Sequence, residues 1–467
     1  MSVFQSRALS IILLTAAAVL FDCCAPKVTD SILPLDPPER FSNTGQQELP
    51  QKWWTSFEDE SLNDLVQIAL DSNFNLLAAW QRFQAAQALA DRESSFLLPD
   101  VEAFFTAGRS IPEPDFRGGE NQQIGMSANY EVDLWGRIRS QVQAERYRTD
   151  ATQADYRAAA ISLSAEITRA WYQLMAARRQ QDLAQQQVET NENILKLIVA
   201  RFGSGQIRGV DILRQKQLVE ATRGQLISVE SQIQVLENQM AVLIGEPPQE
   251  AIIYSPDTLP ALPPLPATGI PVELIRRRPD VQSAFFRLQA ADRELASAIS
   301  ARYPRLSINL SASARSNELD DVFRNWAYSL GGNLVAPLFY GGRISAEINR
   351  TEAVKQQLLY EYGQTVLVAL QEVEDALIQE QKQLERIEVL REQVKLAQQA
   401  YQQLRVEYLN GLSDYLAVLA AANQEQQLQR DLISAKLDLI DFRVGLYRAL
   451  AGGIDAGRRE QALNEGD

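Results

Sequence analysis

The chain has 467 residues, a formal net charge of −15, no histidine and only two cysteines. Without histidine, the sequence lacks the commonest metal ligand and the commonest general base. Cys23 and Cys24 are adjacent, so they can build neither a disulfide framework nor a cysteine-rich metal site. The acidic balance argues against nucleic acid, whose phosphates are bound by patches of Lys and Arg. We therefore expect no enzyme, no metal, no cofactor and no nucleic-acid partner.

The N-terminus is typical of an export signal. A charged start precedes an apolar run over residues 8–21, which is too short to span a bilayer as a helix but fits a signal-peptide core. The run ends at Cys23-Cys24, in the place where bacterial lipoproteins are cleaved and acylated. Asp22 disfavours cleavage before Cys23, so we predict a signal peptide over residues 1–23 and lipid attachment, including palmitate, at Cys24. Attachment at Cys23 and an ordinary signal cleaved nearby are the alternatives.

The chain repeats one plan with an offset of 206 residues. The matching segments are Gly136-Arg137-Ile138 with Gly342-Arg343-Ile344, and Arg201-Phe202-Gly203-Ser204-Gly205 with Glu407-Tyr408-Leu409-Asn410-Gly411. Because one offset holds from residue 136 to residue 205, the pattern indicates duplication. We expect each copy to contain a helix, two strands and then a long helical hairpin.

Two pairs of segments alternate apolar residues with small or polar ones. The apolar members are Val101, Ala103, Phe105 and Ala107; Ile124, Met126, Ala128, Tyr130 and Val132; Leu306, Ile308, Leu310, Ala312 and Ala314; and Trp326, Tyr328, Leu330, Leu334 and Ala336. A period of two over about ten residues is typical of transmembrane β-strands. A soluble antiparallel sheet with one wet face would give any single strand the same pattern, but four such strands in a duplicated context favour the membrane.

Long helical hairpins follow each strand pair. Between Arg343 and Gly411 there is a single Gly and no Pro, and apolar residues recur at heptad a and d positions. These positions are Ile387, Leu390, Val394, Ala397, Tyr401, Leu404 and Tyr408; Leu428, Leu432, Ala435, Leu439, Phe442, Leu446 and Ala449; and, in the first copy, Leu226, Val229, Ile233, Leu236, Met240 and Leu243. The pattern predicts antiparallel coiled coils with helices of about 65 residues, on the order of 100 Å long, which suit a tube or a rod.

Domain boundaries follow from these patterns. We expect a lipid-anchored extended segment over residues 24–60, a first repeat over 61–245 and a second repeat over 272–453. Prolines recur between residues 246 and 271 and predict an extended linker. The charged residues 454–467 predict a disordered tail.

The number of strands limits how they can cross a membrane. Four strands are too few to enclose a lumen, because eight strands already only fill their own interior. An open sheet in lipid would leave unpaired edges, which the bilayer does not tolerate. If these strands span a membrane, several chains must therefore share one barrel, in a number that this reasoning leaves open.

Five groups of residues occur in the order found in one known family. They are Trp53-Trp54 and Phe57 before Leu62-Asn63-Asp64-Leu65; Asn129 to Arg137; Arg277-Arg278-Pro279-Asp280-Val281; Pro337 to Arg343; and the glycine turns at Gly205 and Gly411. On these residues the chain resembles the TolC-like outer-membrane efflux proteins, in particular their OprM/NodT-like lipoprotein branch. The resemblance runs from about Cys24 to Gly453.

The resemblance implies a mainly α fold with transmembrane β. Three chains would form a homotrimer with a 12-strand β-barrel, continued into the periplasm by a 12-helix α-barrel. The implied function is that of an outer-membrane channel subunit of a Gram-negative bacterium, lipid-anchored, which passively exports drugs and other toxic small molecules and so supports multidrug resistance. The implied partners are a periplasmic adaptor (membrane fusion) protein, a proton-driven inner-membrane RND-type pump and outer-membrane lipid.

The hairpin ends hold the candidate aperture residues. Gly205 and Gly411 are predicted to close the hairpins, because glycine permits the conformation of the turn. The resemblance implies that Asp211 and Tyr408 help to close the periplasmic aperture, and we add Asp414 as a hypothesis. The alternatives are structural: Asp211 as a first-turn carboxylate favoured by the helix dipole, and Tyr408 as a heptad core residue.

One departure from the family pattern concerns the charged lock of this aperture. Ser413, Ala417 and Ala420 stand where an Arg and two Asp would complete it. A charged ring of that kind is therefore not expected. We predict instead an aperture made by Asp211, Asp414 and packed apolar residues.

Gly136 and Gly342 mark the points where a strand is followed by a helix, and Pro337 lies five residues before Gly342. Proline and glycine end strands and permit bends, so we predict architectural hinges at these three residues. The segment Arg278-Pro279-Asp280 stands at a predicted helix start and is interpreted as structural.

Two other functions remain open from the sequence. The same architecture could serve as the outer-membrane duct of a protein secretion system, although the lipobox-like cysteine favours small-molecule efflux. A periplasmic coiled-coil scaffold without a pore is the second alternative. Adaptors of that class carry one hairpin flanked by small β-domains, whereas this chain has two hairpins and amphipathic strand pairs.

Overall fold

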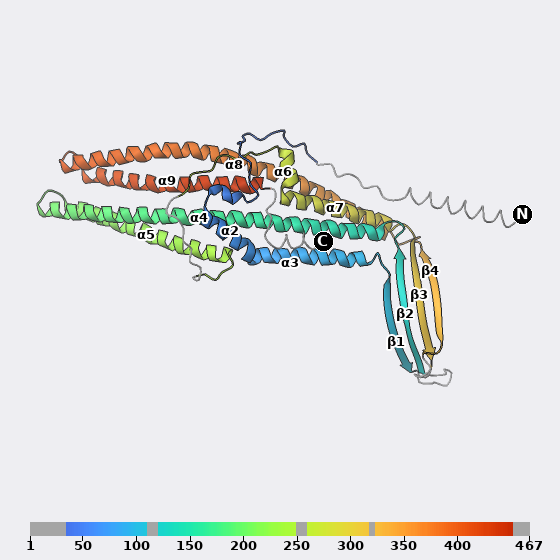
Figure 1. Cartoon of the computed structure of the whole chain (residues 1–467). Coiled ribbons are helices and arrows are strands. Elements are labelled where there is room, and N and C mark those ends of the chain that lie inside the picture. Colours follow the sequence, from blue (N-terminus) through green and yellow to red (C-terminus); the bar gives the residue numbers. More distant parts are fainter. Residues whose placement is uncertain (1–33, 110–119, 249–258, 317–322, 452–467) are drawn as a thin grey trace. The chain divides into compact units, whose positions relative to one another are not determined.

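The computed structural model in Figure 1 describes residues 34–109, 120–248, 259–316 and 323–451. In chain order the elements are η1 (Trp53–Phe57, a 3-10 helix), α2 (Glu60–Ser72), α3 (Phe74–Ser95), β1 (Asp100–Arg109), β2 (Glu120–Val132), α4 (Arg137–Gly203), α5 (Gly209–Leu243), α6 (Pro271–Arg277), α7 (Pro279–Ser300), β3 (Arg305–Ser316), β4 (Trp326–Val335), α8 (Arg343–Leu409) and α9 (Tyr415–Leu450). None of the helices in this part of the chain is both long and apolar enough to cross a membrane. The predicted signal peptide, Cys24 and the predicted tail lie outside the described residues, as does part of the predicted linker.

The long helices predicted from the heptads are confirmed. Helices α4 and α8 have 67 residues each, and they are followed by α5 with 35 residues and α9 with 36. Within the α8–α9 pair, the predicted seam residues Ile387, Leu390, Leu428, Ala435 and Leu439 form one buried apolar cluster. Long helices without a globular core are thus stabilised by packing of one face on a partner helix.

Each strand pair is preceded by two helices, where the sequence predicted one. Asn73 separates α2 from α3, and its side-chain oxygen accepts a hydrogen bond from the backbone N–H of Leu76 at 3.1 Å. Arg278 separates α6 from α7 and has extended backbone (φ −69°, ψ 125°). Pro279 imposes this break, because the residue before a proline is disfavoured in the helical region.

The chain forms two compact units. The first contains Gln81–Gln153 and Ser283–Thr365, and the second contains Pro37–Trp80, Ala154–Gln282 and residues 366–451. Helices α4 and α8 contribute to both units. Each unit therefore combines segments of both predicted repeats.

The first unit holds one antiparallel sheet with the order β1-β2-β3-β4 (Figure 1). All four strands predicted from the alternation are present. The register aligns Phe105 with Ile124, Ile124 with Ala314, and Ala314 with Trp326. Since aligned residues share a face and the side-chain period is two, the alternating apolar residues of all four strands gather on one face.

The opposite face of this sheet is polar. Asn309 Nδ2 donates to Asn129 Oδ1 at 2.5 Å, and Arg315 Nη2 donates to Gln123 Oε1 at 3.0 Å. The hydroxyls of Ser311 and Ser329 lie 2.8 Å apart on β3 and β4. The sheet thus presents one apolar and one hydrogen-bonded polar surface.

In the second unit, two extended segments far apart in sequence run together. Gly45 N donates to Pro266 O at 2.9 Å, and Ala267 N donates to Gln47 O at 2.7 Å. Arg443 of α9 donates to the carbonyl oxygens of two linker prolines, Pro263 and Pro264. The linker and the segment before η1 are therefore held against the helical hairpin.

Candidate functional site

The connections between strands and helices contain the predicted hinges. Gly136 lies between β2 and α4 with φ 73°, and Gly342 lies just before α8 with φ 84°. These angles belong to the left-handed region, which glycine adopts without the penalty that a Cβ brings. Pro337 lies two residues after the end of β4 and has no N–H to continue a strand ladder. The backbone angles of the two glycines and the position of Pro337 are compatible with the predicted hinges.

The connection after β2 is fastened by residues whose role the sequence did not reveal. The Asp133 carboxylate accepts hydrogen bonds from the backbone N–H groups of Ile138 at 3.1 Å and Arg139 at 2.8 Å, so it caps α4. Trp135 Nε1 donates to Pro304 O at 2.8 Å, and its ring stacks on Tyr303 at 4.8 Å. The start of α4 is thus tied to the residues that precede β3.

The two hairpin ends have the same turn geometry. Gly205 has φ 73° and Gly411 has φ 75°. The residue after each glycine donates its N–H to a carbonyl five residues earlier: Gln206 to Arg201 at 3.1 Å, and Leu412 to Glu407 at 2.9 Å. This pattern satisfies the last carbonyls of the long helices and requires a left-handed residue, which explains both glycines.

Asp211 and Tyr408 face the same small region near the hairpin ends. Asp211 lies in the first turn of α5 and is 4% exposed, with its carboxylate 3.8 Å from the guanidinium groups of Arg208 and Arg214. Burial, followed by the charge of Asp211, raises the pKa of Tyr408, and Arg201 opposes that shift. Among the described residues, neither the Tyr408 hydroxyl nor Asp211 Oδ1 has a hydrogen-bond partner. Two buried polar atoms are thus left without the partners that buried groups normally find.

Asp414 does not belong to that pair. Its carboxylate accepts a hydrogen bond from the backbone N–H of Ala417 at 2.9 Å, and it is the N-cap of α9. The side chain is exposed. The structure therefore gives Asp414 a helix-capping role, which is sufficient to account for an Asp at this position.

A buried polar network next to Tyr408 was missed by sequence reasoning. The Tyr415 hydroxyl donates to Gln215 Oε1, and Gln215 Nε2 donates to Asn191 O at 2.7 Å. Gln426 Nε2 of α9 donates to Asn191 Oδ1 at 3.3 Å. The only sequence signal was the occurrence of amides in otherwise apolar faces of long helices, and such amides are usually exposed.

A groove adjoins these residues. It has a volume of about 260 Å³ and is lined by residues from 190–198 of α4, residues from 401–409 of α8, and Tyr415 and Val418 of α9. The rings of Tyr408 and Tyr415 lie 5.3 Å apart in it, and the guanidinium of Arg201 lies 5.8 Å from the Tyr408 ring. The hairpin ends thus combine an aromatic concave surface with exposed turns.

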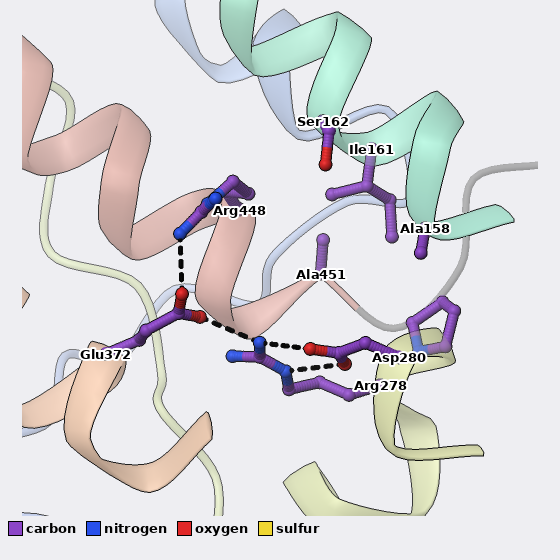
Figure 2. Close-up of a pocket in the computed structure, with 9 residues that line it drawn as sticks. Ala158, Ile161, Ser162, Arg278, Asp280, Glu372, Arg448 and Ala451 are labelled. Atoms are coloured by element: carbon purple, nitrogen blue, oxygen red, sulfur yellow. Dashed lines mark hydrogen bonds and ion pairs between the residues drawn. The ribbon is translucent and has the colours of Figure 1, made fainter. Parts of the chain in front are cut away.

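A second polar cluster holds the junction of α6 and α7 (Figure 2). Arg278 Nη2 donates to Asp280 Oδ2 at 2.6 Å and to Glu372 Oε2 at 2.7 Å, and Arg448 Nη2 donates to Glu372 Oε1 at 2.7 Å. Burial alone would raise the pKa of Asp280, but the hydrogen bonds and charge of Arg278 lower it. The two cations and two anions pair with each other, so we interpret the cluster as a structural clamp between α7, α8 and α9.

Comparisons with known proteins agree with this architecture. Residues 65–246 and 270–452 match the family described as outer membrane efflux protein. OpmQ of Pseudomonas aeruginosa, a pyoverdine export outer membrane protein, is 30% identical over an alignment of 467 residues, which covers 97% of this chain and 98% of OpmQ. TtgF of Pseudomonas putida, a toluene efflux pump outer membrane protein, is 30% identical over 431 residues, which cover 89% of this chain and 88% of TtgF.

Solved structures show the same fold. The outer-membrane channel OprN is 28% identical and superposes with a TM-score of 0.82 over 93% of this chain and 97% of OprN. A membrane protein from Pseudomonas aeruginosa, also 28% identical, gives a TM-score of 0.86 over 93% of this chain and 99% of that protein. The chain therefore belongs to the outer membrane efflux protein family, and the resemblance inferred from its sequence is confirmed.

Proposed function

We propose that the protein is the outer-membrane channel subunit of a tripartite efflux system, through which small molecules leave the cell passively. The observation that carries this proposal is the amphipathic four-stranded sheet, joined through glycine hinges to long helical hairpins. An apolar face suits lipid and a polar face suits an aqueous lumen. Energy for export would come from an inner-membrane pump, with a periplasmic adaptor between the pump and this channel.

A homotrimer is the assembly that we propose. Each chain supplies four strands, so three chains supply the twelve strands of one shared barrel and the helices of a 12-helix tube. Sharing removes the unpaired edges that β1 and β4 leave in a single chain. Neither the barrel nor the tube exists in one chain by itself.

For the cargo of this channel we propose a chemical class, toxic small molecules, and no single compound. The named cargoes of the two relatives, pyoverdine and toluene, differ widely in size and polarity. Chains with equal identity to this one therefore serve different compounds. We infer that the pump selects the drugs and other toxic small molecules that are exported.

From the sequence we also propose that a lipid attached to Cys24 anchors the protein in the outer membrane.

At the hairpin ends we propose a periplasmic aperture that Asp211 and Tyr408 help to hold closed. The support is the burial of Asp211 together with two buried polar atoms that lack a hydrogen-bond partner among the described residues, since a neighbouring chain or an adaptor can supply one. The groove between α4 and α8 offers the adaptor a concave aromatic surface. We also propose that the negative charge of Asp414, which lies close to the turn, helps to close the aperture, in addition to the capping role of this residue.

Planar-bilayer recording of the protein purified from outer membranes tests these proposals. A verified trimer is expected to conduct ions, and a verified trimer without conductance would favour the scaffold alternative. Asp211→Ala is expected to raise the open probability. If conductance and open probability stayed at the wild-type values, Asp211 would have no place in the aperture.

A matched pair of variants separates charge from capping at Asp414. Asp414→Asn removes the charge but keeps an N-cap oxygen, whereas Asp414→Ala removes both. If the charge helps to close the aperture, the two variants raise the open probability equally. An effect confined to Asp414→Ala would assign this residue to helix capping alone.

A further inference from the structure

Within the described part of the chain, the sheet of the first unit ends in two strands that are each paired on one side only. Its order is β1-β2-β3-β4, so β1 and β4 are the edges. Every residue of β4 is exposed, and every residue of β1 except one is exposed, whereas β3 contains the buried Ala314 and several half-buried residues. Edge strands of this length, ten residues each, are templates for pairing with another chain, because their outer backbone groups are not used by the sheet.

Large apolar side chains continue both edges beyond the strands. Phe96 and Leu98 precede β1 and are 48% and 67% exposed. Leu338 and Phe339 follow β4 and are 93% and 87% exposed. Because β1 and β4 run antiparallel, the start of β1 and the end of β4 lie at the same end of the sheet. Each edge of the sheet therefore carries two exposed apolar residues at this one end.

We propose that these four residues form a clasp between neighbouring copies of the chain, in which Phe96 and Leu98 of one copy pack on Leu338 and Phe339 of the next. This inference rests on the shared sheet of the proposed function and names the side chains that join its copies. We call Phe96, Leu98, Leu338 and Phe339 the clasp residues.

The geometry favours a second copy of the chain over other occupants. If β1 of the next copy adds to β4 as an antiparallel strand, the segment before that β1 lies beside the segment after β4. The same chain cannot bring the two segments together, because three strand spacings, on the order of 14 Å, separate its edges. The contact joins two different surfaces, so its repetition gives a ring when the rotation between copies closes, as a shared barrel requires.

Cysteine cross-linking tests the clasp in the full-length protein in outer membranes. Leu98→Cys combined with Leu338→Cys should give covalent dimers and trimers on mild oxidation, with at least about fivefold more linked protein than either single variant. The single variants also control for the native Cys23 and Cys24. An intrachain disulfide is excluded by the distance across the sheet, since the Cα atoms of a disulfide lie within about 7 Å.

A matched control pair uses an exposed leucine at the hairpin end. Leu412 is 78% exposed, and Leu98→Cys with Leu412→Cys should remain unlinked. Replacement of the clasp by Leu338→Ser and Phe339→Ser should reduce the trimer fraction in mild detergent by at least about half, whereas Leu412→Ser should not reduce it.

The outcomes separate the clasp from the channel function. A trimer by native mass that conducts ions but forms no links through Leu98→Cys and Leu338→Cys overturns the clasp and leaves the proposed function intact. Protein that is monomeric by native mass in intact membranes overturns both. If the serine variants stay trimeric but leave the membrane more easily, the exposed side chains contact lipid, and the clasp is wrong.

Discussion

The second unit contains two kinds of contact between long helices. One is the contact between α8 and α9 within a single hairpin, and the other is the contact between α4 and α9, which belong to different hairpins. Inside the α8–α9 hairpin, the described contacts include a buried apolar cluster around Ile387 and Leu390. Between α4 of one hairpin and α9 of the other, the described contacts include a series of side-chain hydrogen bonds, most of them made by amides. These are Gln180 Nε2 to Ser434 Oγ at 3.2 Å, Gln187 Nε2 to Gln429 Oε1 at 3.3 Å, Arg430 Nη1 to Gln187 Oε1 at 2.9 Å and Gln426 Nε2 to Asn191 Oδ1 at 3.3 Å.

The two contacts differ in the free energy that is needed to separate them. Separating an apolar cluster exposes surface to water, at about 25 cal/mol per Å² of apolar area. Amide hydrogen bonds are replaced by bonds to water when they break, so each contributes only about 0.5 to 1.5 kcal/mol net. Near the hairpin ends α4 and α9 also share an apolar cluster of Ile198, Tyr415 and Val418. Along residues 180–191 of α4, where the described contacts to α9 are hydrogen bonds, we expect the hairpins to separate more easily than the two helices of one hairpin. The following changes test this contrast, in order of decreasing effect.

The largest effect is expected at the one buried ion pair inside the α8–α9 hairpin. Arg443 and Glu380 are 2% and 5% exposed, and Arg443 Nη2 and Nε donate to the Glu380 carboxylate at 2.6 and 2.8 Å. Arg443→Met leaves Glu380 charged and buried, so the unfolding free energy should fall by about 4 kcal/mol per chain. Helix content followed by circular dichroism during chemical unfolding measures the change.

The double variant Arg443→Met with Glu380→Met is the control for that ion pair. Removing both charges should restore most of the lost stability, because no uncompensated charge is left. If the double variant were as unstable as the single one, loss of the Arg443 bonds to Pro263 and Pro264 would be the main cause instead.

A slightly smaller effect is expected in the apolar cluster. Ile387→Ala removes buried methyl and methylene groups and should lower the unfolding free energy by about 3 kcal/mol per chain. Hydrogen exchange should show faster opening of α8 and α9 around this position. Val389→Ala is the matched control, because Val389 is exposed on the same helix, and it should change stability little. Equal effects of the two variants would contradict a stabilising role of the buried cluster in this hairpin.

An intermediate, pH-dependent effect is expected at Asp441 on the α9 face toward α4. Burial, opposed by Arg169 and Gln173 and reinforced by Asp438, raises its pKa from 3.8 to about 6. Between these pH values the folded state binds more protons than the unfolded state, so stability falls as pH rises through that window. With allowance for partial solvent exposure, the ionised group destabilises the fold by about 2 kcal/mol at neutral pH.

Asp441→Asn should therefore raise the unfolding midpoint at pH 7.5 and leave it nearly unchanged at pH 4. Unfolding curves at the two pH values measure the difference. The same shift at both pH values would mean that Asp441 acts through packing and not through its charge.

The smallest effect is expected in the polar contact between hairpins. Gln187→Ala removes hydrogen bonds to Gln429 and Arg430, and the unfolding free energy should fall by about 1 kcal/mol or less. Gln187→Leu with Arg430→Leu should instead make the contact apolar and lower the open probability in bilayer recordings. A loss of stability as large as that of Ile387→Ala would show that the two contacts are equally firm.

Much of the fold could be predicted because its signals are local. The four strands followed from alternation at positions such as Phe105 and Tyr328, and the long helices followed from heptads such as Ile387 and Leu390. The break at Asn73 was missed, because a single Asn is also tolerated inside a helix and only its hydrogen bond to Leu76 N shows the cap.

Less of the candidate site could be predicted. Gly205 and Gly411 were expected in turns, and their backbone angles agree with that conformation. The sequence analysis placed both Asp211 and Asp414 in the candidate aperture, yet one is buried beside Tyr408 and the other caps α9. Their difference depends on which way each helix faces its neighbours.

The sequence by itself determined the elements of this protein and the family to which it belongs, because periodicity, glycine turns and motif order act within or along a segment. Only the tertiary structure decided that residues 180–191 of α4 meet α9 through side-chain amides, that Arg443 is buried against the proline-rich linker, and that both sheet edges end in exposed apolar residues. Those features depend on contacts between residues far apart in the chain. Local preferences do not determine such contacts, because a glutamine or a leucine on a helix surface has the same propensity whether a partner covers it or not.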